Sequence, residues 1–316
     1  MSLRLGIRPY RLPLRRPWIS ARGEVRERVG WLVIASAGSL SGFGDCSPLP
    51  EAGTETGSQA ERRLEYWGNL PLSTIDDNAI ASLLDALPCA EPGPTPAADC
   101  AVETALLDLR ARRRGLPLRL LLAADAADQN SAEQRAADQI LVNAALGIVA
   151  TLTQEQIATA SAEGYRVFKV KVGTAAPADE LALIQAAALA LPQGGSFRLD
   201  ANGAWDRHTA ACFIAGLDGL PIDCLEEPLQ VPDHADLAAL QAVAPFAIAL
   251  DETLPRCLRR RPRADRHPQH DPQHDPTLDL TGLPVRRLVL KPGVLGGLRS
   301  TLRLARLARA AGREVV

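Results

Sequence analysis

The chain has 316 residues, of which 47% are hydrophobic and 23% are charged, and these proportions are typical of a globular protein with one large domain or two smaller ones. Its formal net charge of -2 excludes the strongly basic nucleic-acid binders and the proteins that bind acidic membranes through charge. No apolar run approaches the roughly 18 residues of a membrane span. We therefore predict neither a nucleic-acid partner nor a membrane partner.

The N-terminus and the cysteines indicate the cellular compartment. Several arginines stand in the first turns of the chain without an apolar segment behind them, so we predict no signal peptide. The cysteines, at positions 46, 89, 100, 212, 224 and 257, lie too far apart for a zinc site or a disulfide framework. We expect a cytoplasmic protein with reduced thiols.

Residues 1–125 are predicted to form an α+β domain. The segment GWLVIASAGSLSGFGDCSPLP, residues 30–50, predicts two strands around a glycine-rich turn and then a proline-rich loop. Residues 58–70 and 100–115 predict amphipathic helices, and Gly115 is expected to end the second one.

Residues 126–316 are predicted to form a second domain in which strands and helices alternate. Such alternation predicts parallel strands joined by helical crossovers. The expected strands are 140–146, 166–172, 196–202, 222–228, 246–252 and 285–292, and the expected helices are 153–164, 179–191, 206–217, 234–244 and 298–312.

Two observations favour a barrel over an open doubly wound sheet. Polar residues follow the carboxyl ends of successive strands, where barrel enzymes place their chemistry. No G-x-G-x-x-G turn follows the first strand, as a dinucleotide-binding sheet would usually show. Six units and the start of a seventh strand are present, so we predict an α/β protein with a capping domain and an incomplete TIM-type (β/α) barrel whose last strands are missing.

One segment breaks the alternation. Residues 256–284 are rich in Pro, Arg and His and contain the near-repeat HPQHDPQHDP, a composition that predicts a disordered surface insertion. His267, His270 and His274 within it could capture a transition metal, but a solvated insertion is the better interpretation.

The strand RVFKVKV carries two positive charges on one face. Phe168, Val170 and Val172 alternate with Lys169 and Lys171, so the other face is apolar. Burying ammonium groups is costly unless opposite charges face them. We therefore expect carboxylates across from this face.

The next two strands supply carboxylates. Arg198, Asp200 and Asn202 share one face of SFRLDAN. In CLEEP, Glu226 is expected to point inward and Glu227 away.

The last predicted strands complete the set. In ALDE, residues 249–252, Asp251 stands at the end of the strand with Glu252 beside it. LVLKP places Lys291 at the end of its strand. Three converging carboxylates, Asp200, Glu226 and Asp251, would repel one another unless a hard divalent cation bound them. Oxygen-only ligation is what Mg²⁺ prefers, so we predict a Mg²⁺ site.

Lysines on both sides of such a site indicate proton chemistry. A metal-bound substrate carboxylate between Lys171 and Lys291 could lose its α-proton to a lysine base, and the cation would neutralise the charge that forms. The positive charges of Lys169 and Mg²⁺ are expected to lower the pKa of Lys171.

Any one of these residues could be an ordinary salt-bridge partner, and a lone Lys-x-Lys strand could be an edge strand defended by charge. The ordered combination K-x-K, D-x-N, E-E-P, D-E and K-P, each at a predicted strand end, is much harder to obtain by chance.

This combination resembles the enolase superfamily, in the subgroup that includes muconate-lactonising enzymes, dipeptide epimerases and o-succinylbenzoate synthases. The segments GFGDCSPLPEAGTET, VETALLDL and LVNAAL resemble most the synthase family. The resemblance implies Asp200, Glu226 and Asp251 as metal ligands, Lys171 as general base tuned by Lys169, Lys291 as the opposing lysine, and Asn202 and Arg198 as substrate-binding residues, with Asn202 also supporting the site.

The resemblance implies Mg²⁺-dependent dehydration of a hydroxy-cyclohexadiene carboxylate, a small-molecule carboxylate substrate, as a carbon–oxygen lyase reaction. The alternatives are an epimerase or racemase of dipeptides or N-succinylamino acids, a cycloisomerase, and a non-catalytic remnant. Family members continue for two further strands, so we expect this chain to be C-terminally truncated. The oligomeric state is left open.

Overall fold

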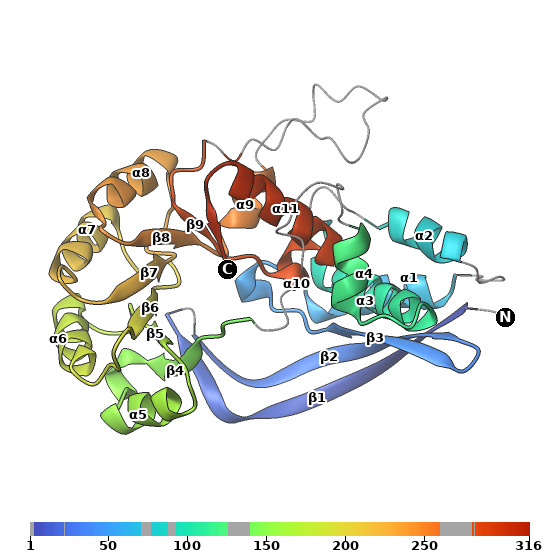
Figure 1. The fold of residues 1–316 in the computed structure, drawn as a ribbon, viewed down its shortest axis with the longest axis horizontal. Coiled ribbons are helices and arrows are strands. Elements are labelled where there is room, and N and C mark those ends of the chain that lie inside the picture. Colours follow the sequence, from blue (N-terminus) through green and yellow to red (C-terminus); the bar gives the residue numbers. More distant parts are fainter. Residues whose placement is uncertain are drawn as a thin grey trace.

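The computed structural model describes residues 3–21, 23–70, 77–87, 93–125, 140–259, 280 and 282–316. They form a three-stranded antiparallel sheet covered by helices and, beside it, a seven-stranded parallel sheet with its own helices (Figure 1). The predicted α/β class, with an antiparallel first part and a parallel-stranded second part, is confirmed. No helix in the described part of the chain is long and apolar enough to cross a membrane.

The first part, which we call the capping part, covers residues 3–125. Its strands are β1 (Leu3–Ser20), β2 (Gly23–Ala37) and β3 (Leu40–Cys46), and its α-helices are α1 (Gly57–Gly68), α2 (Asp77–Asp85), α3 (Pro96–Arg113) and α4 (Leu118–Asp125).

Helix α3 packs against β3 at two glycines. A Cβ atom built on Gly44 would lie 1.9 Å from the carbonyl oxygen of Ala101, and one built on Gly42 would lie 2.2 Å from the amide nitrogen of Leu109. The helix backbone therefore approaches the strand more closely than any side chain would allow, which is why glycine stands at both positions.

Strand β1 was not predicted from the sequence. It pairs with β2 from Leu3 opposite Ala37 to Ser20 opposite Gly23, with a register shift between Pro13 and Trp18. Figure 1 shows the turn of this hairpin beside β4 of the second part, which β1 contacts. The hairpin thus brings the capping part to the mouth of the parallel sheet.

The second part, the barrel part, has strands in the order of the sequence, all parallel, with β4 and β10 at the edges of the described sheet. The strands are β4 (Ala144–Ile148), β5 (Val167–Lys171), β6 (Ser196–Asp200), β7 (Ile222–Glu226), β8 (Ala247–Leu250), β9 (Arg287–Leu288) and β10 (Glu314–Val315). The α-helices are α5 (Gln154–Ala162), α6 (Pro177–Ala188), α7 (Arg207–Gly216), α8 (His234–Val243), α9 (Leu254–Arg259), α10 (Pro292–Leu295) and α11 (Leu298–Ala310).

The two faces of the parallel sheet differ as the alternation predicts. Phe168 and Val170 of β5 are buried in the apolar layer between sheet and helices, together with Leu199 of β6. The opposite face of the strands carries Lys169, Lys171 and small residues. Polar groups are therefore confined to the inside of the curved sheet and to the strand ends.

A buried carboxylate joins the two parts. Glu103 of α3 accepts hydrogen bonds from the backbone amide of Leu298 and from the Arg299 guanidinium, the latter at 2.8 Å. The same guanidinium donates to the carbonyl oxygen of Leu84. The first turn of α11 is thus tied to the capping helices, close after the segment that carries Lys291.

The prediction of a disordered insertion over residues 256–284 is wrong at both of its ends, because Leu280 and Leu283 also belong to the barrel core. Residues 256–259 belong to α9, because Leu258 packs against the barrel core and Leu254 is fully buried at the start of the helix. The predicted histidines at 267, 270 and 274 lie outside the described residues. The predicted domain boundary at 125/126 borders residues 126–139, which also lie outside them, so it stays a prediction.

We predict that Gly44→Ala destabilises the protein by about 3 kcal/mol or more, because the new methyl group meets a helix carbonyl that cannot move aside. Gly6→Ala is the matched control in the same sheet, since its Cβ would lie 3.9 Å from its nearest neighbours, and we expect a change within about 0.5 kcal/mol. Urea unfolding of both variants measures the difference. Equal stabilities would contradict the close packing of α3 on β3.

Candidate active site

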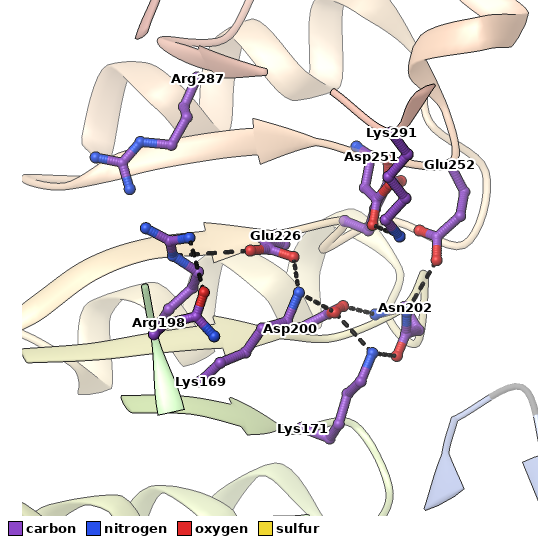
Figure 2. Close-up of polar contacts among 12 residues, drawn as sticks. Lys169, Lys171, Arg198, Asp200, Asn202, Glu226, Asp251, Glu252, Arg287 and Lys291 are labelled. Atoms are coloured by element: carbon purple, nitrogen blue, oxygen red, sulfur yellow. Dashed lines mark hydrogen bonds and ion pairs between the residues drawn. The ribbon is translucent and has the colours of Figure 1, made fainter. Parts of the chain in front are cut away.

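The ends of five parallel strands bring the predicted site residues together (Figure 2). Strand pairing places Lys171 opposite Asp200 and Asp200 opposite Glu226, so these three side chains form a row across β5, β6 and β7. Asp251 follows β8 and Lys291 follows β9, which extends the row. Side chains from residues 171 to 291 of the sequence therefore meet at one end of the parallel sheet, as the parallel topology requires.

Three carboxylates of the row are buried. Asp200 and Glu226 are each 1% exposed and Asp251 is 4% exposed. Buried carboxylates are costly unless positive charge faces them. Their arrangement therefore demands cations on the same side of the sheet.

Lysines supply that charge here. The Lys169 ammonium bridges Asp200, at 3.0 Å, and Glu226. The Lys171 ammonium donates to Asp200 Oδ2 and to Asn202 Oδ1, both at 2.7 Å. At the other side of the row, Lys291 pairs with Asp251.

The pKa values follow from this crowding. Burial, with the neighbouring Asp200 and Asp251 charges, raises the pKa of Glu226 to about 7 against the pull of Lys169. Burial also opposes ionisation of Asp200, but the two lysines of β5 outweigh it and lower the pKa of Asp200 to about 2. Burial would lower the pKa of Lys169, yet its two carboxylate partners raise it.

The same balance holds at Lys291. Burial alone would lower the pKa of this lysine, but the carboxylate of Asp251 raises it above its ordinary value. Lys169 and Lys291 are therefore held in the charged form by the carboxylates that they neutralise.

The carboxylates fit Mg²⁺ by chemistry and burial. Each of the three carboxylates forms an ion pair with a lysine. Within the described residues, no three Asp, Glu, His or Cys side chains lie close enough together to hold a metal ion as they stand. The Lys169 ammonium, however, already bridges two of the three carboxylates, as a bound cation would. An all-oxygen set at adjacent strand ends is suited to a hard divalent cation.

Asn202 connects Lys171 to the residue that follows Asp251. Its side chain accepts from Lys171 and donates to Glu252 Oε1 at 3.2 Å, while its backbone amide donates to Asp200 Oδ1 at 3.1 Å. Its φ of 48° lies in the left-handed region. These contacts favour the predicted supporting role, and contact of Asn202 with a substrate stays a prediction.

Arg198 lies beyond Glu226, away from Lys171 and Lys291 (Figure 2). Its guanidinium pairs with Asp223 at 2.8 Å, and Asp223 also pairs with Arg287 at 2.6 Å. Arg198 Nε reaches Glu226 Oε1 at 3.9 Å. All these contacts are with other side chains of the barrel interior, so a substrate contact of Arg198 stays a prediction.

Trp18 is a residue of this region that sequence reasoning missed. The Lys171 ammonium lies 5.5 Å from the centre of the Trp18 ring, within the range of a cation–π contact. Trp18 stands near the turn of the β1–β2 hairpin and is 44% exposed. No local signal marks it, because its position depends on how the hairpin docks on the barrel part.

A further signal could have been read from composition. Lys169, Lys171 and Lys291 are the only lysines of the chain, whose other basic residues are arginines and five histidines. All three meet at the row of carboxylates. Arginine cannot release its proton in proteins, whereas a lysine can.

We predict that Mg²⁺ raises the free energy of unfolding, by about 2.7 kcal/mol at a concentration one hundred times its Kd. Asp200→Asn, Glu226→Gln and Asp251→Asn should each remove most of this gain. Asp99→Asn, at a buried carboxylate that pairs with Arg63 in the capping part, should keep it. Thermal unfolding with and without Mg²⁺ gives the comparison, and loss of the gain in Asp99→Asn alone would refute the assignment.

Two family models match the chain. The model "MenC, N-terminal domain" matches residues 4–90, in the capping part, and the model "Enolase C-terminal domain-like" matches residues 152–263, in the barrel part.

Relatives of known name agree with these models. The o-succinylbenzoate synthase of Thermosynechococcus vestitus is 32% identical over 78% of this chain and 67% of its own length. The o-succinylbenzoate synthase of Desulfotalea psychrophila is 28% identical over 98% of this chain and 84% of its own length. A chloromuconate cycloisomerase of Cupriavidus necator is 27% identical over 95% of this chain and 75% of its own length.

Solved structures share the fold. The dipeptide epimerase of Enterococcus faecalis, solved with Mg and the dipeptide L-Leu-L-Tyr, superposes with a TM-score of 0.76 at 21% identity and covers 100% of this chain and 82% of its own. The muconate lactonizing enzyme of Pseudomonas fluorescens has a TM-score of 0.74 at 22% identity, over 99% of this chain and 79% of its own. The chain belongs to the enolase superfamily, in the subgroup of the muconate-lactonising enzymes.

Proposed function

We propose that this protein is a Mg²⁺-dependent carbon–oxygen lyase that dehydrates 2-succinyl-6-hydroxy-2,4-cyclohexadiene-1-carboxylate to o-succinylbenzoate, a step of menaquinone biosynthesis. The observation that carries the proposal is the placement of Lys171 and Lys291 at opposite ends of a row of three buried carboxylates (Figure 2). The two o-succinylbenzoate synthase relatives and the MenC N-terminal domain match support this substrate.

Asp200, Glu226 and Asp251 would hold the cation. When bound, Mg²⁺ would orient the ring carboxylate of the substrate and neutralise the charge that develops on it. Lys169, which contacts both Asp200 and Glu226, would keep these ligands oriented and add positive charge beside Lys171.

Lys171 would carry the proton through both halves of the reaction. As the neutral amine it removes the proton from the carbon that bears the carboxylate. The C–O bond on the same face then breaks, and the departing hydroxide takes that proton from the Lys171 ammonium and leaves as water. One residue thus serves as base and then as acid, which requires a syn elimination, and the product ring becomes aromatic.

Lys291 would act as a cation rather than as a base. It lies at the opposite end of the row from Lys171, and its ammonium pairs with Asp251. A charged lysine over the ring face stabilises the electron-rich system that forms as the proton leaves. A small-molecule carboxylate is the partner that this chemistry requires, and a cytoplasmic location remains part of the proposal.

A second candidate is epimerisation of dipeptides or N-succinylamino acids. The observation that favours it is again the pair of opposed lysines, because inversion at an α-carbon needs a base on one face and an acid on the other. In that reaction Lys171 and Lys291 would both exchange protons with the substrate, and muconate cycloisomerisation would be a third use of the same site.

Arginine substitutions separate these reactions, because arginine keeps the positive charge but cannot accept a proton. For the lyase we predict that Lys171→Ala and Lys171→Arg each lower kcat by about 1,000-fold, whereas Lys291→Arg keeps activity within about tenfold. Turnover is measured on the cyclohexadiene carboxylate, N-succinylamino acids, dipeptides and muconate, with Mg²⁺.

Equal loss in both arginine variants, together with turnover of a dipeptide or an N-succinylamino acid, would favour the epimerase. Absence of turnover on all four substrates, in a chain that binds no Mg²⁺, would refute the enzyme proposal.

A further inference from the structure

Glu227 joins the ends of the three strands that carry the proposed metal ligands. It directly follows Glu226, the last residue of β7. Its amide donates to the carbonyl oxygen of Ala249 in β8 at 3.0 Å, and its carbonyl oxygen accepts from Gly203, after β6, at 2.7 Å. Its backbone alone therefore ties β7 to both neighbours.

The side chain of Glu227 extends this link to the third ligand. Its Oε1 accepts from the backbone amide of Asp251 at 2.6 Å and from that of Thr253 at 2.9 Å, and its Oε2 accepts from the Thr253 hydroxyl at 2.7 Å. The carboxylate is 2% exposed. One buried side chain thus fixes the backbone from which the Asp251 carboxylate projects.

The backbone of Glu227 is held in a conformation that side chains rarely adopt. Its φ is 46°, and among the described residues only Asn202 is another non-glycine residue with positive φ. Both residues lie within two positions of a proposed metal ligand. Such outliers persist only where surrounding contacts over-determine them, and they gather at functional sites.

We infer that Glu227 is a positioning residue of the metal site, an inference that rests on the Mg²⁺ site of the proposed function. In this role its carboxylate contacts Asp251 and Thr253 and would touch neither the substrate nor the cation. Its carboxylate holds the loop after β8 so that Asp251 meets Asp200 and Glu226 at a fixed spacing. Partners that orient metal ligands in this way typically change metal affinity by about 10- to 100-fold when they are replaced.

Glu180 offers a matched control. It is fully buried, and its carboxylate accepts from the backbone amides of Gly173, Thr174 and Ala175 at 2.7, 2.9 and 3.1 Å. It therefore caps a loop after a barrel strand, as Glu227 does, but this loop follows β5 and carries no proposed metal ligand. Loss of either carboxylate leaves backbone donors unpaired, whereas only one of the two should disturb Mg²⁺ binding.

The test is calorimetric titration of the apo protein with MgCl₂, alongside thermal unfolding. For Glu227→Ala and Glu227→Gly we expect the Kd for Mg²⁺ to rise by about 10- to 100-fold. Glycine relieves the backbone strain but does not restore the carboxylate, so it should not rescue affinity. Glu180→Ala should lower the melting temperature while its Kd stays within about threefold of the unaltered protein.

Should the alanine variant fail to fold, Glu227→Gln answers the question, since its amide oxygen can still accept from the backbone amides of Asp251 and Thr253. Its amide nitrogen can donate to the Thr253 hydroxyl, so this variant should retain most of the affinity. Unchanged affinity in Glu227→Ala and Glu227→Gly, or an equal loss in Glu180→Ala, would overturn the positioning role and leave the metal site standing. Absence of Mg²⁺ binding by the unaltered chain would overturn the site itself and this role with it.

Discussion

Three carboxylates buried side by side at the ends of parallel strands need positive charge nearby, and the rest of the site follows from that need. Asp200, Glu226 and Asp251 come from consecutive strands, and at the short spacing between neighbouring strands unpaired charges repel strongly in a buried setting. The fold meets this need with lysines at both ends of the row. A cation that binds the same oxygens would release those lysines for chemistry.

The capping part completes this arrangement from outside the barrel. The β1–β2 hairpin reaches the mouth and places Trp18 over Lys171, while Glu103 ties the first turn of α11 to helix α3. Lys291 follows β9, and only the short helix α10 separates it from that turn. Lys171 thus contacts the capping part directly, and Lys291 lies close in the chain to a contact between the two parts.

The parallel half of the fold could be predicted from the sequence because each strand carries a local, repeated signal. The period-two alternation of Lys169 and Lys171 with apolar residues is confirmed by the buried outer face of β5, and the strand ends brought the carboxylates together as their spacing indicates. Strand β1 was missed because its alternation is interrupted by prolines, three of which fall between Arg8 and Trp18. Helix α9 was missed because its arginines were read with the polar segment that follows.

The remaining site residues could not be found from local patterns. The roles of Trp18 and Glu227 depend on contacts with segments distant in sequence or on an unusual φ, and neither leaves a periodic trace. The substrate-binding roles of Arg198 and Asn202 came from the family resemblance and stay predictions, because the contacts of both side chains in the structure are with other residues of the site.

The most direct test of the account follows the lysines themselves. Because the chain has only three lysines, protein labelled with ¹³C,¹⁵N-lysine should give three side-chain NMR signals, assigned by substitution of Lys169, Lys171 and Lys291 in turn. We predict that added Mg²⁺ shifts the Lys169 and Lys291 signals and lowers the raised pKa of both, because the cation takes over the carboxylates that now hold them charged. Signals and pKa values that stay unchanged at saturating Mg²⁺ would contradict the claim that these carboxylates form one cation site.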